Sequence, residues 1–232
     1  MVQSERFQCR WTAALAAGAV AVGLLATGCE NGLEREADRR RDDGADNNGF
    51  PPIRELETVV FDFGAVWRYN DSNVDLGTEW KDPAYRDRTW KSGPAEFGFG
   101  EGDEDTLVAD LDPNVPSIYF RKAFELPRVP RGGAINLKFD DGAAVWVNGR
   151  QVAEFDFGDG AAFSEYATGD DATNRETVRF DAKNPFVAGK NLMAVMVKNV
   201  DEDSSDLSFD ARLALEIDPP GPGSEPDPFF QP

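Results

Sequence analysis

Short segments of alternating apolar and polar residues, separated by turn residues, are the feature that most constrains the fold. In residues 207–217, apolar side chains recur at every second position: Leu207, Phe209, Ala211, Leu213, Leu215 and Ile217. Successive side chains of a strand point to opposite faces, so this period predicts a strand with one buried face. Residues 135–139 alternate in the same way. Residues 192–197 (LMAVMV) are apolar throughout, as expected for a central strand covered on both sides.

The same patterns predict further strands at residues 58–63, 66–69, 118–126, 144–147, 151–155 and 176–180. Asn148 and Gly149 lie between two of these segments and predict a tight hairpin turn. Lys122 shares its parity with Phe120 and Phe124, which indicates an edge or a bulge in that strand. Residues 82–90 are expected to hold a short helical turn. Many strands at turn-separated spacing predict one antiparallel β-sandwich or barrel over residues 57–217.

The N-terminus reads as an export signal. Arg6 and Arg10 precede an uncharged run at residues 11–27, which is short for a spanning helix. Residues 25–29 (LATGC) then resemble the bacterial lipobox, in which the cysteine is lipidated and cleavage occurs just before it. We therefore expect a signal peptide at residues 1–28 and a lipid anchor on Cys29 in the bacterial cell envelope, at the outer membrane or the cell surface. An ordinary secretory peptide or an uncleaved anchor are the alternatives.

The segments on either side of the strands are polar or rich in Pro and Gly. Residues 29–56 are charged and Gly/Asn-rich, a composition that buries no core and predicts a flexible tether. Residues 218–232 (DPPGPGSEPDPFFQP) are too rich in Pro and Gly to continue a sheet and predict a disordered tail.

The charge balance limits the classes of molecule that this chain is expected to bind. The chain has 24 basic and 43 acidic residues and a net charge of −19, and such a surface repels phosphate backbones. Nucleic acid is therefore not an expected partner. The sequence has no histidine, and one of its two cysteines, Cys9, lies in the export signal. The common nucleophile and base pairs are thus missing, and no disulfide framework is expected in the mature chain.

Three sequence segments follow one another along the chain: residues 119–127 (YFRKAFELP), 143–149 (AAVWVNG) and 188–199 (AGKNLMAVMVKN). Together they resemble the galactose-binding-like jelly roll, the N-terminal sugar-binding domain of β-galactosidases and β-glucuronidases. Residues 67–69, 90–100 and 205–210, with Trp80, resemble a variant found as an accessory module in secreted bacterial proteins. The resemblance covers residues 57–217 and implies a two-sheet sandwich that binds ligands at the loops of one end.

In the glycosidases of that family the catalytic carboxylates sit in a separate barrel of ~250 residues, for which this chain has no room. Adjacent carboxylates such as Asp140 and Asp141 point to opposite faces of a strand and do not supply a glycosidase pair by spacing alone. We expect a non-catalytic, membrane-anchored binding module, with carbohydrate as ligand. The alternative is a protein-interaction or structural module that docks on an envelope protein; a carboxylate-based glycan hydrolase is the least favoured.

Sugar sites combine an aromatic platform with polar groups for the hydroxyls. The candidate ligand-binding residues chosen on this basis are Trp80, Tyr166, Asp170, Asp171 and Asn174. Two acidic stretches offer the dense oxygen ligands that Ca²⁺ prefers, although neither has EF-hand spacing. The candidate ligands for a structural Ca²⁺ are Asp103, Asp105, Asp201, Asp203 and Asp206.

Overall fold

The computed structural model describes residues 49–50, 52–54, 57–108, 115–158, 163–169, 173–181 and 185–219. They belong to one compact unit, residues 42–232. The predicted signal peptide, Cys29, and most of the predicted tether and tail lie outside the described residues. Within the described part of the chain, no helix is long and apolar enough to cross a membrane.

The described residues form an almost all-β chain. One short 3-10 helix, η1 (Glu79–Lys81), is the helical element found there. The strands are β1 (Glu57–Phe61), β2 (Val66–Asn70), β3 (Lys91–Pro94), β4 (Phe97–Phe99), β5 (Thr106–Leu107), β6 (Ser117–Leu126), β7 (Gly132–Asp140), β8 (Gly142–Val147), β9 (Arg150–Phe155), β10 (Asn174–Phe180), β11 (Gly189–Lys198) and β12 (Leu207–Glu216).

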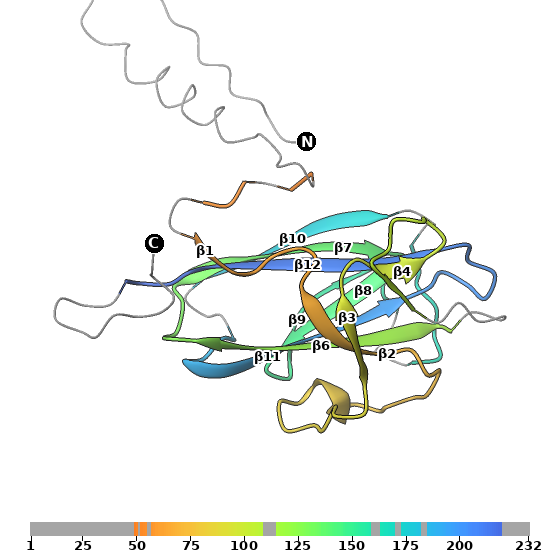
Figure 1. The fold of residues 1–232 in the computed structure, drawn as a ribbon, viewed down its shortest axis with the longest axis horizontal. Helices are drawn as coiled ribbons and strands as arrows, with labels where there is room; N and C mark the ends of the chain where they lie inside the picture. Colours follow the sequence, from red (N-terminus) through yellow and green to blue (C-terminus); the bar gives the residue numbers. More distant parts are fainter. Residues whose placement is uncertain are drawn as a thin grey trace, which may run out of the picture. The chain divides into compact units, whose positions relative to one another are not determined.

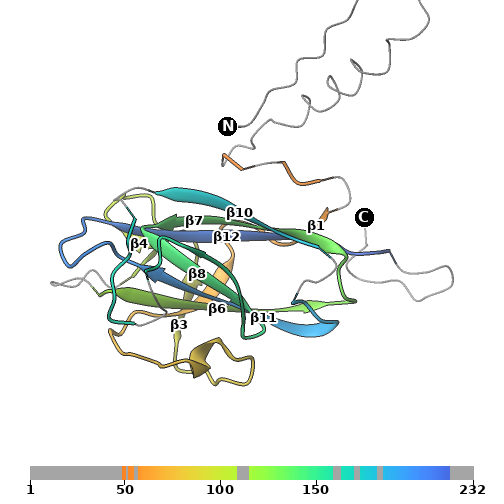
Figure 2. The same ribbon diagram turned by 180° about the vertical axis from the view of Figure 1, so that it is seen from behind.

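These strands form two six-stranded sheets stacked face to face, as Figures 1 and 2 show from opposite sides. Sheet A has the order β10-β7-β12-β4-β5, and β1 also pairs with β12. Sheet B has the order β3-β2-β6-β11-β8-β9. The pairs are antiparallel except for the short parallel pair β4–β5. The predicted antiparallel β-sandwich is therefore confirmed.

The main core lies between the sheets and follows from the alternation in the sequence. From sheet A it takes Phe209 and Leu213 of β12 and their neighbours at every second position; from sheet B it takes Phe120 and Val195. β11 is buried on both faces, as its uninterrupted apolar run predicts. The Asn148–Gly149 hairpin is also confirmed, because both residues have positive φ (51° and 80°) and Val147 pairs with Arg150.

Two local predictions are wrong. The helical turn lies at η1 rather than within residues 82–90. β6 is neither an edge strand nor bulged, since it pairs without interruption with β11 over its whole length. Lys122 can face the interior because its long stem passes the rings of Phe61 and Trp67, and its Nζ donates to the carbonyl of Val66 at 2.8 Å.

A second apolar cluster covers the outer face of sheet B. The loop that carries η1 lies against that face in Figures 1 and 2 and brings Trp80 onto the rings of Tyr119 and Trp146. Arg121 of β6, which is 3% exposed, holds this loop against the sheet by hydrogen bonds. Its Nε donates to Asp87 Oδ2 at 2.9 Å, and its Nη atoms donate to three loop carbonyls, those of Trp80, Asp82 and Tyr85. We call this loop, residues 71–90, the cap.

Candidate functional site

The outer face of sheet A is polar, because the alternation that turns apolar residues inward turns their neighbours outward. The register places Lys138 of β7 between Arg175 of β10 and Asp210 of β12. One charged side chain from each of three adjacent strands therefore stands in a row across the sheet. We call these three residues the first row.

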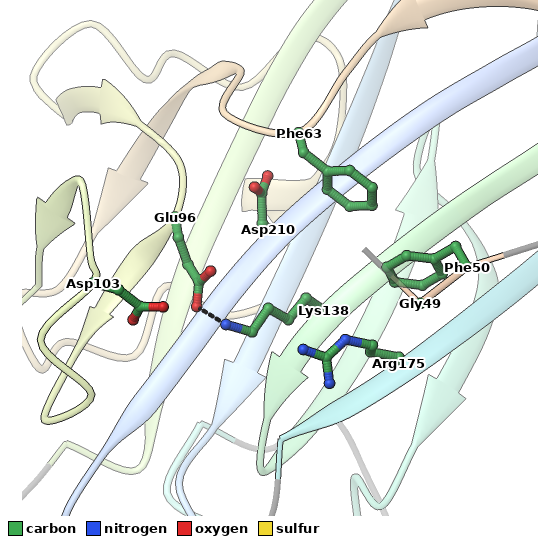
Figure 3. A pocket seen from close by; sticks show the side chains of 8 residues that line it. All are labelled: Gly49, Phe50, Phe63, Glu96, Asp103, Lys138, Arg175 and Asp210. Carbon is green, nitrogen blue, oxygen red and sulfur yellow. Dashed lines mark hydrogen bonds and ion pairs between the residues drawn. The ribbon is translucent and has the colours of Figure 1, made fainter. Parts of the chain in front are cut away.

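The first row lines a cavity of about 480 Å³. Loop residues complete its walls, and Figure 3 shows the eight side chains that surround it. The loop residues are Gly49, Phe50, Phe63, Glu96 and Asp103. Because strands fix the row and loops supply the rest, the pocket combines a rigid floor with adaptable walls.

Lys138 carries the strongest ion pair of the pocket. Its Nζ lies 2.5 Å from Glu96 Oε1 and 3.5 Å from Glu101 Oε2, and the Lys138 side chain is 15% exposed. Burial by itself would lower the pKa of Lys138, but the hydrogen bond to Glu96 and the nearby carboxylates raise it overall. Burial raises the pKa of Glu96, and the contact with Lys138 opposes that rise. This pair is charged and mutually satisfied.

Asp210 is buried and holds the backbone around it. Its Oδ2 accepts the backbone N–H of Gly64 at 2.9 Å, and its Oδ1 accepts that of Ala211 at 2.7 Å. Burial raises the pKa of Asp210 to about 7, although both backbone N–H groups act in the opposite direction. This carboxyl therefore titrates near neutral pH and fixes the turn that carries Phe63.

Arg175 and Asp103 are the two charged groups of the pocket that remain available. Among the described residues neither makes a hydrogen bond or an ion pair, and both residues are exposed. In Figure 3 they approach from opposite sides, with the Lys138–Glu96 pair between them. The guanidinium of Arg175, a hydrogen-bond donor, and the carboxylate of Asp103, an acceptor with two oxygens, thus face the same cavity.

Two phenylalanines form the apolar wall. Phe63 is half-buried, and Phe50 stacks on it with ring centroids 5.2 Å apart at 27°. Phe50 is only 2% exposed, so the packed part of the chain begins inside the range predicted as a tether (29–56). We call residues 49, 50 and 52–54 the strap.

Among the described residues, one group of carboxylates meets closely enough to hold a metal ion. It comprises Glu96, Glu101 and Asp103, whose nearest oxygens lie within 4.8 Å of one another. Hard oxygen ligands of this kind suit Ca²⁺. However, the Lys138 ammonium already sits on two of these carboxylates. These three carboxylates therefore fit Ca²⁺ only if the ion competes with the Lys138 ammonium for them.

The predicted calcium ligands do not come together. Asp103 belongs to the acidic group just described, whereas Asp105 is exposed and outside it. Asp201 Oδ1 accepts the backbone N–H of Asp203 at 2.8 Å, which is a local turn contact. Asp206 Oδ1 accepts the Ser205 hydroxyl at 3.0 Å.

The structure describes three of the predicted sugar-binding residues, Trp80, Tyr166 and Asn174. Trp80 is 1% exposed and its ring packs on Tyr119 and Trp146, so it offers no platform to a ligand. Tyr166 is half-buried, and its pKa is raised by burial and then by the acidic turn 201–203. Asn174 donates from Nδ2 to the backbone carbonyl of Asp141 at 3.3 Å. Asp170 and Asp171 lie outside the described residues.

Sequence reasoning did not find Lys138, Arg175, Asp210, Glu96 or Phe63. Three of them are outward positions of strands, where charged residues are ordinary and carry no signal of their own. Only the register, which sets Arg175 and Asp210 on either side of Lys138, shows that they form a row. A sequence-based search could have found the three strands but not that alignment.

Comparison with known proteins leaves the family open. No protein family matches the sequence, and no curated protein matches it either. Among solved structures, a calcium-binding mutant of Bacteroides uniformis β-glucuronidase 2 aligns at 19% identity with a TM-score of 0.41, over 66% of this chain and 17% of that one. A Bifidobacterium dentium β-glucuronidase aligns at 19% identity and a TM-score of 0.41, over 64% and 21%.

A β-glucuronidase from an uncultured Clostridium species aligns at 14% identity and a TM-score of 0.44, over 72% of this chain and 30% of that one. The described chain thus corresponds to less than a third of each of these enzymes. What places the chain among β-sandwiches is its own pair of stacked sheets.

Proposed function

We propose that this chain binds carbohydrate in the pocket on the outer face of sheet A. The observation that carries the proposal is the pairing of an available guanidinium, Arg175, with an available carboxylate, Asp103, across one cavity. A sugar hydroxyl accepts one hydrogen bond and donates another, so neighbouring hydroxyls can bridge these two groups. Phe50 and Phe63 together give the cavity an apolar wall beside these groups, which suits the C–H groups of the same sugar.

We propose that binding is not followed by catalysis. A glycosidase needs one carboxyl that gives up a proton and a second that acts as base or nucleophile. Here both oxygens of Asp210 accept backbone N–H groups, and Glu96 is paired with Lys138. Of the three carboxyl groups among the lining residues, only Asp103 is then left available, so the pair that a glycosidase needs is incomplete, which supports a binding module.

We also propose that a lipid on Cys29 anchors this module to the bacterial cell envelope. The support is the sequence at residues 25–29 and the basic, apolar segment before it. Replacing Cys29→Ala should move the expressed protein from the membrane fraction to the soluble fraction. Equal membrane retention of the variant would contradict the anchor.

A glycan array, probed with the full chain in detergent, tests the proposed ligand class. We expect binding to a defined glycan, and an Arg175→Met variant should lose at least tenfold in affinity, about 1.4 kcal/mol, because one bidentate donor is removed. Arg86→Met, which removes the same charge from the exposed surface of the cap, is the matched control. Unchanged affinity in Arg175→Met would contradict this site. Binding to an envelope protein without any glycan binding would favour a protein-interaction module, and glycan turnover would indicate an enzyme.

A further inference from the structure

A second row of polar side chains runs beside the first row. It consists of Thr177, Asn136 and Arg212, each two positions along its strand from Arg175, Lys138 and Asp210. Two residues along a strand correspond to about 7 Å. Asn136 Nδ2 donates to Thr177 Oγ1 at 2.9 Å, and Arg212 donates to Asn136 Oδ1 at 3.3 Å. The second row is thus a preformed network of donors and acceptors.

The aromatic pair lies at the Arg212 end of this second row. The Arg212 guanidinium lies 5.0 Å from the centroid of the Phe63 ring, and Phe50 stacks on Phe63. Asn136 and Arg212 are only 4% and 5% exposed, although they point away from the core. The second row is therefore a buried polar network with the Phe63 ring against its Arg212 end.

The strap lies outside the strand ladders of the two sheets. Its described residues take part in no strand pairing, since β1 begins only at Glu57. Pro52 has no N–H to offer to a ladder. Among its described residues Phe50 is buried, and the far end is held by an ion pair from Arg54 to Glu216 at 3.9 Å and by two hydrogen bonds between Arg54 and Glu57.

From this arrangement we infer that the Phe50 ring occupies a second sugar subsite, and that the ligand is an oligosaccharide chain that displaces the strap and crosses both rows. A sugar ring presents an apolar face of similar size and can stack on Phe63 in place of Phe50. Its hydroxyls would then lie beside the second row, where Thr177 and Asn136 offer donors and acceptors. This inference rests on the proposed function, because it extends the same pocket.

The test uses the full chain in detergent, with an array that displays each glycan as a series of one to six sugar units. Phe50→Ala should raise the affinity for chains of two or more units at least tenfold, because the binding-competent state is no longer a minor population. The affinity for single sugars should stay within about twofold. Ile53→Ala, in the same strap but outside the ring stack, should leave the length dependence unchanged.

A second measurement uses the unaltered protein, so that a folding defect of Phe50→Ala cannot hide the answer. The longest glycan bound on the array should speed hydrogen exchange at the amides of Phe50 and Ile53, because the strap is released. Slower or unchanged exchange would overturn the inference, as would equal gains of single sugars and chains in Phe50→Ala. If no glycan binds either protein, the proposed function fails as well; if single sugars bind normally and only the length effect is missing, the subsite alone fails.

Discussion

The two outer faces of this sandwich are covered in different ways. Sheet B carries the cap, whose Trp80 is buried among Tyr119 and Trp146 and whose carbonyls are held by Arg121. In the described part of the chain, sheet A carries the strap, whose Phe50 ring lies beside a charged pocket. The cap buries an apolar cluster and stabilises the fold, whereas the strap leaves charged side chains of sheet A accessible to a ligand.

The comparison also separates two kinds of arginine. The guanidinium of Arg121 donates hydrogen bonds to Asp87 and to three carbonyls of the cap. Arg175 has no such partner among the described residues and points into a cavity. An arginine therefore holds the cap in place on sheet B, whereas an arginine on sheet A remains available to donate hydrogen bonds to a ligand.

The largest expected effect comes from making the same substitution on both faces. Arg121→Met should lower the free energy of unfolding by about 3 kcal/mol, because Asp87 and the cap carbonyls lose a buried partner. Arg175→Met should change it by less than about 0.5 kcal/mol. Urea denaturation of both variants checks the contrast. Equal losses would show that Arg175 is a structural residue and would erase the difference between the faces.

A smaller effect concerns pH. Burial raises the pKa of Asp210 from its ordinary value of 3.8 to about 7, so the folded state holds this proton more tightly than the unfolded state. The stability that this group contributes is present below pH 4 and is lost as pH rises through 7. The change between pH 5 and pH 8 should be about 2 kcal/mol.

Asp210→Asn should flatten that slope, since the amide does not titrate, while one backbone N–H loses its acceptor. Urea midpoints measured at several pH values check this. Glu96, which raises the pKa of Asp210, and Lys138, which lowers it, are the charged neighbours to keep intact in the experiment. A parallel slope in the variant would place the titrating group elsewhere.

The smallest effect concerns calcium at Glu96, Glu101 and Asp103. Because Lys138 already pairs with two carboxylates of this group, 1 mM Ca²⁺ should stabilise the unaltered protein by less than about 0.4 kcal/mol, as for a dissociation constant above 1 mM. Lys138→Met removes the competing cation and should increase that stabilisation. Calorimetry with Ca²⁺ and Mg²⁺ distinguishes the cases, and strong stabilisation of the unaltered protein would show that Lys138 does not compete.

The sequence predicted the sandwich because strand periodicity is local: residues 207–217 show their buried face without reference to any neighbour. It missed β3 and β4, where short segments rich in Gly and Pro carry too little alternation to be recognised. It chose Trp80 as a ligand platform because exposure cannot be read from residue type, and the tertiary packing against Trp146 decided otherwise.

The pocket could not be predicted for a different reason. Arg175, Lys138 and Asp210 are far apart in the chain and meet only through the registers of two strand pairs. A shift of one residue in either pair would point one of them to the other side of the sheet. Phe50 was assigned to the tether because it stands in a segment rich in Asn, Gly and Pro without strand alternation, and its burial comes from a ring contact with Phe63 that no local pattern shows.

Mapping of backbone amide shifts during titration with the glycan that binds on the array tests the central claim most directly. The account predicts that the largest shifts fall on Lys138, Arg175 and Asp210 and on the turn at Phe63. Shifts confined to the cap or to the Asn148–Gly149 hairpin, with the outer face of sheet A unchanged, would contradict it.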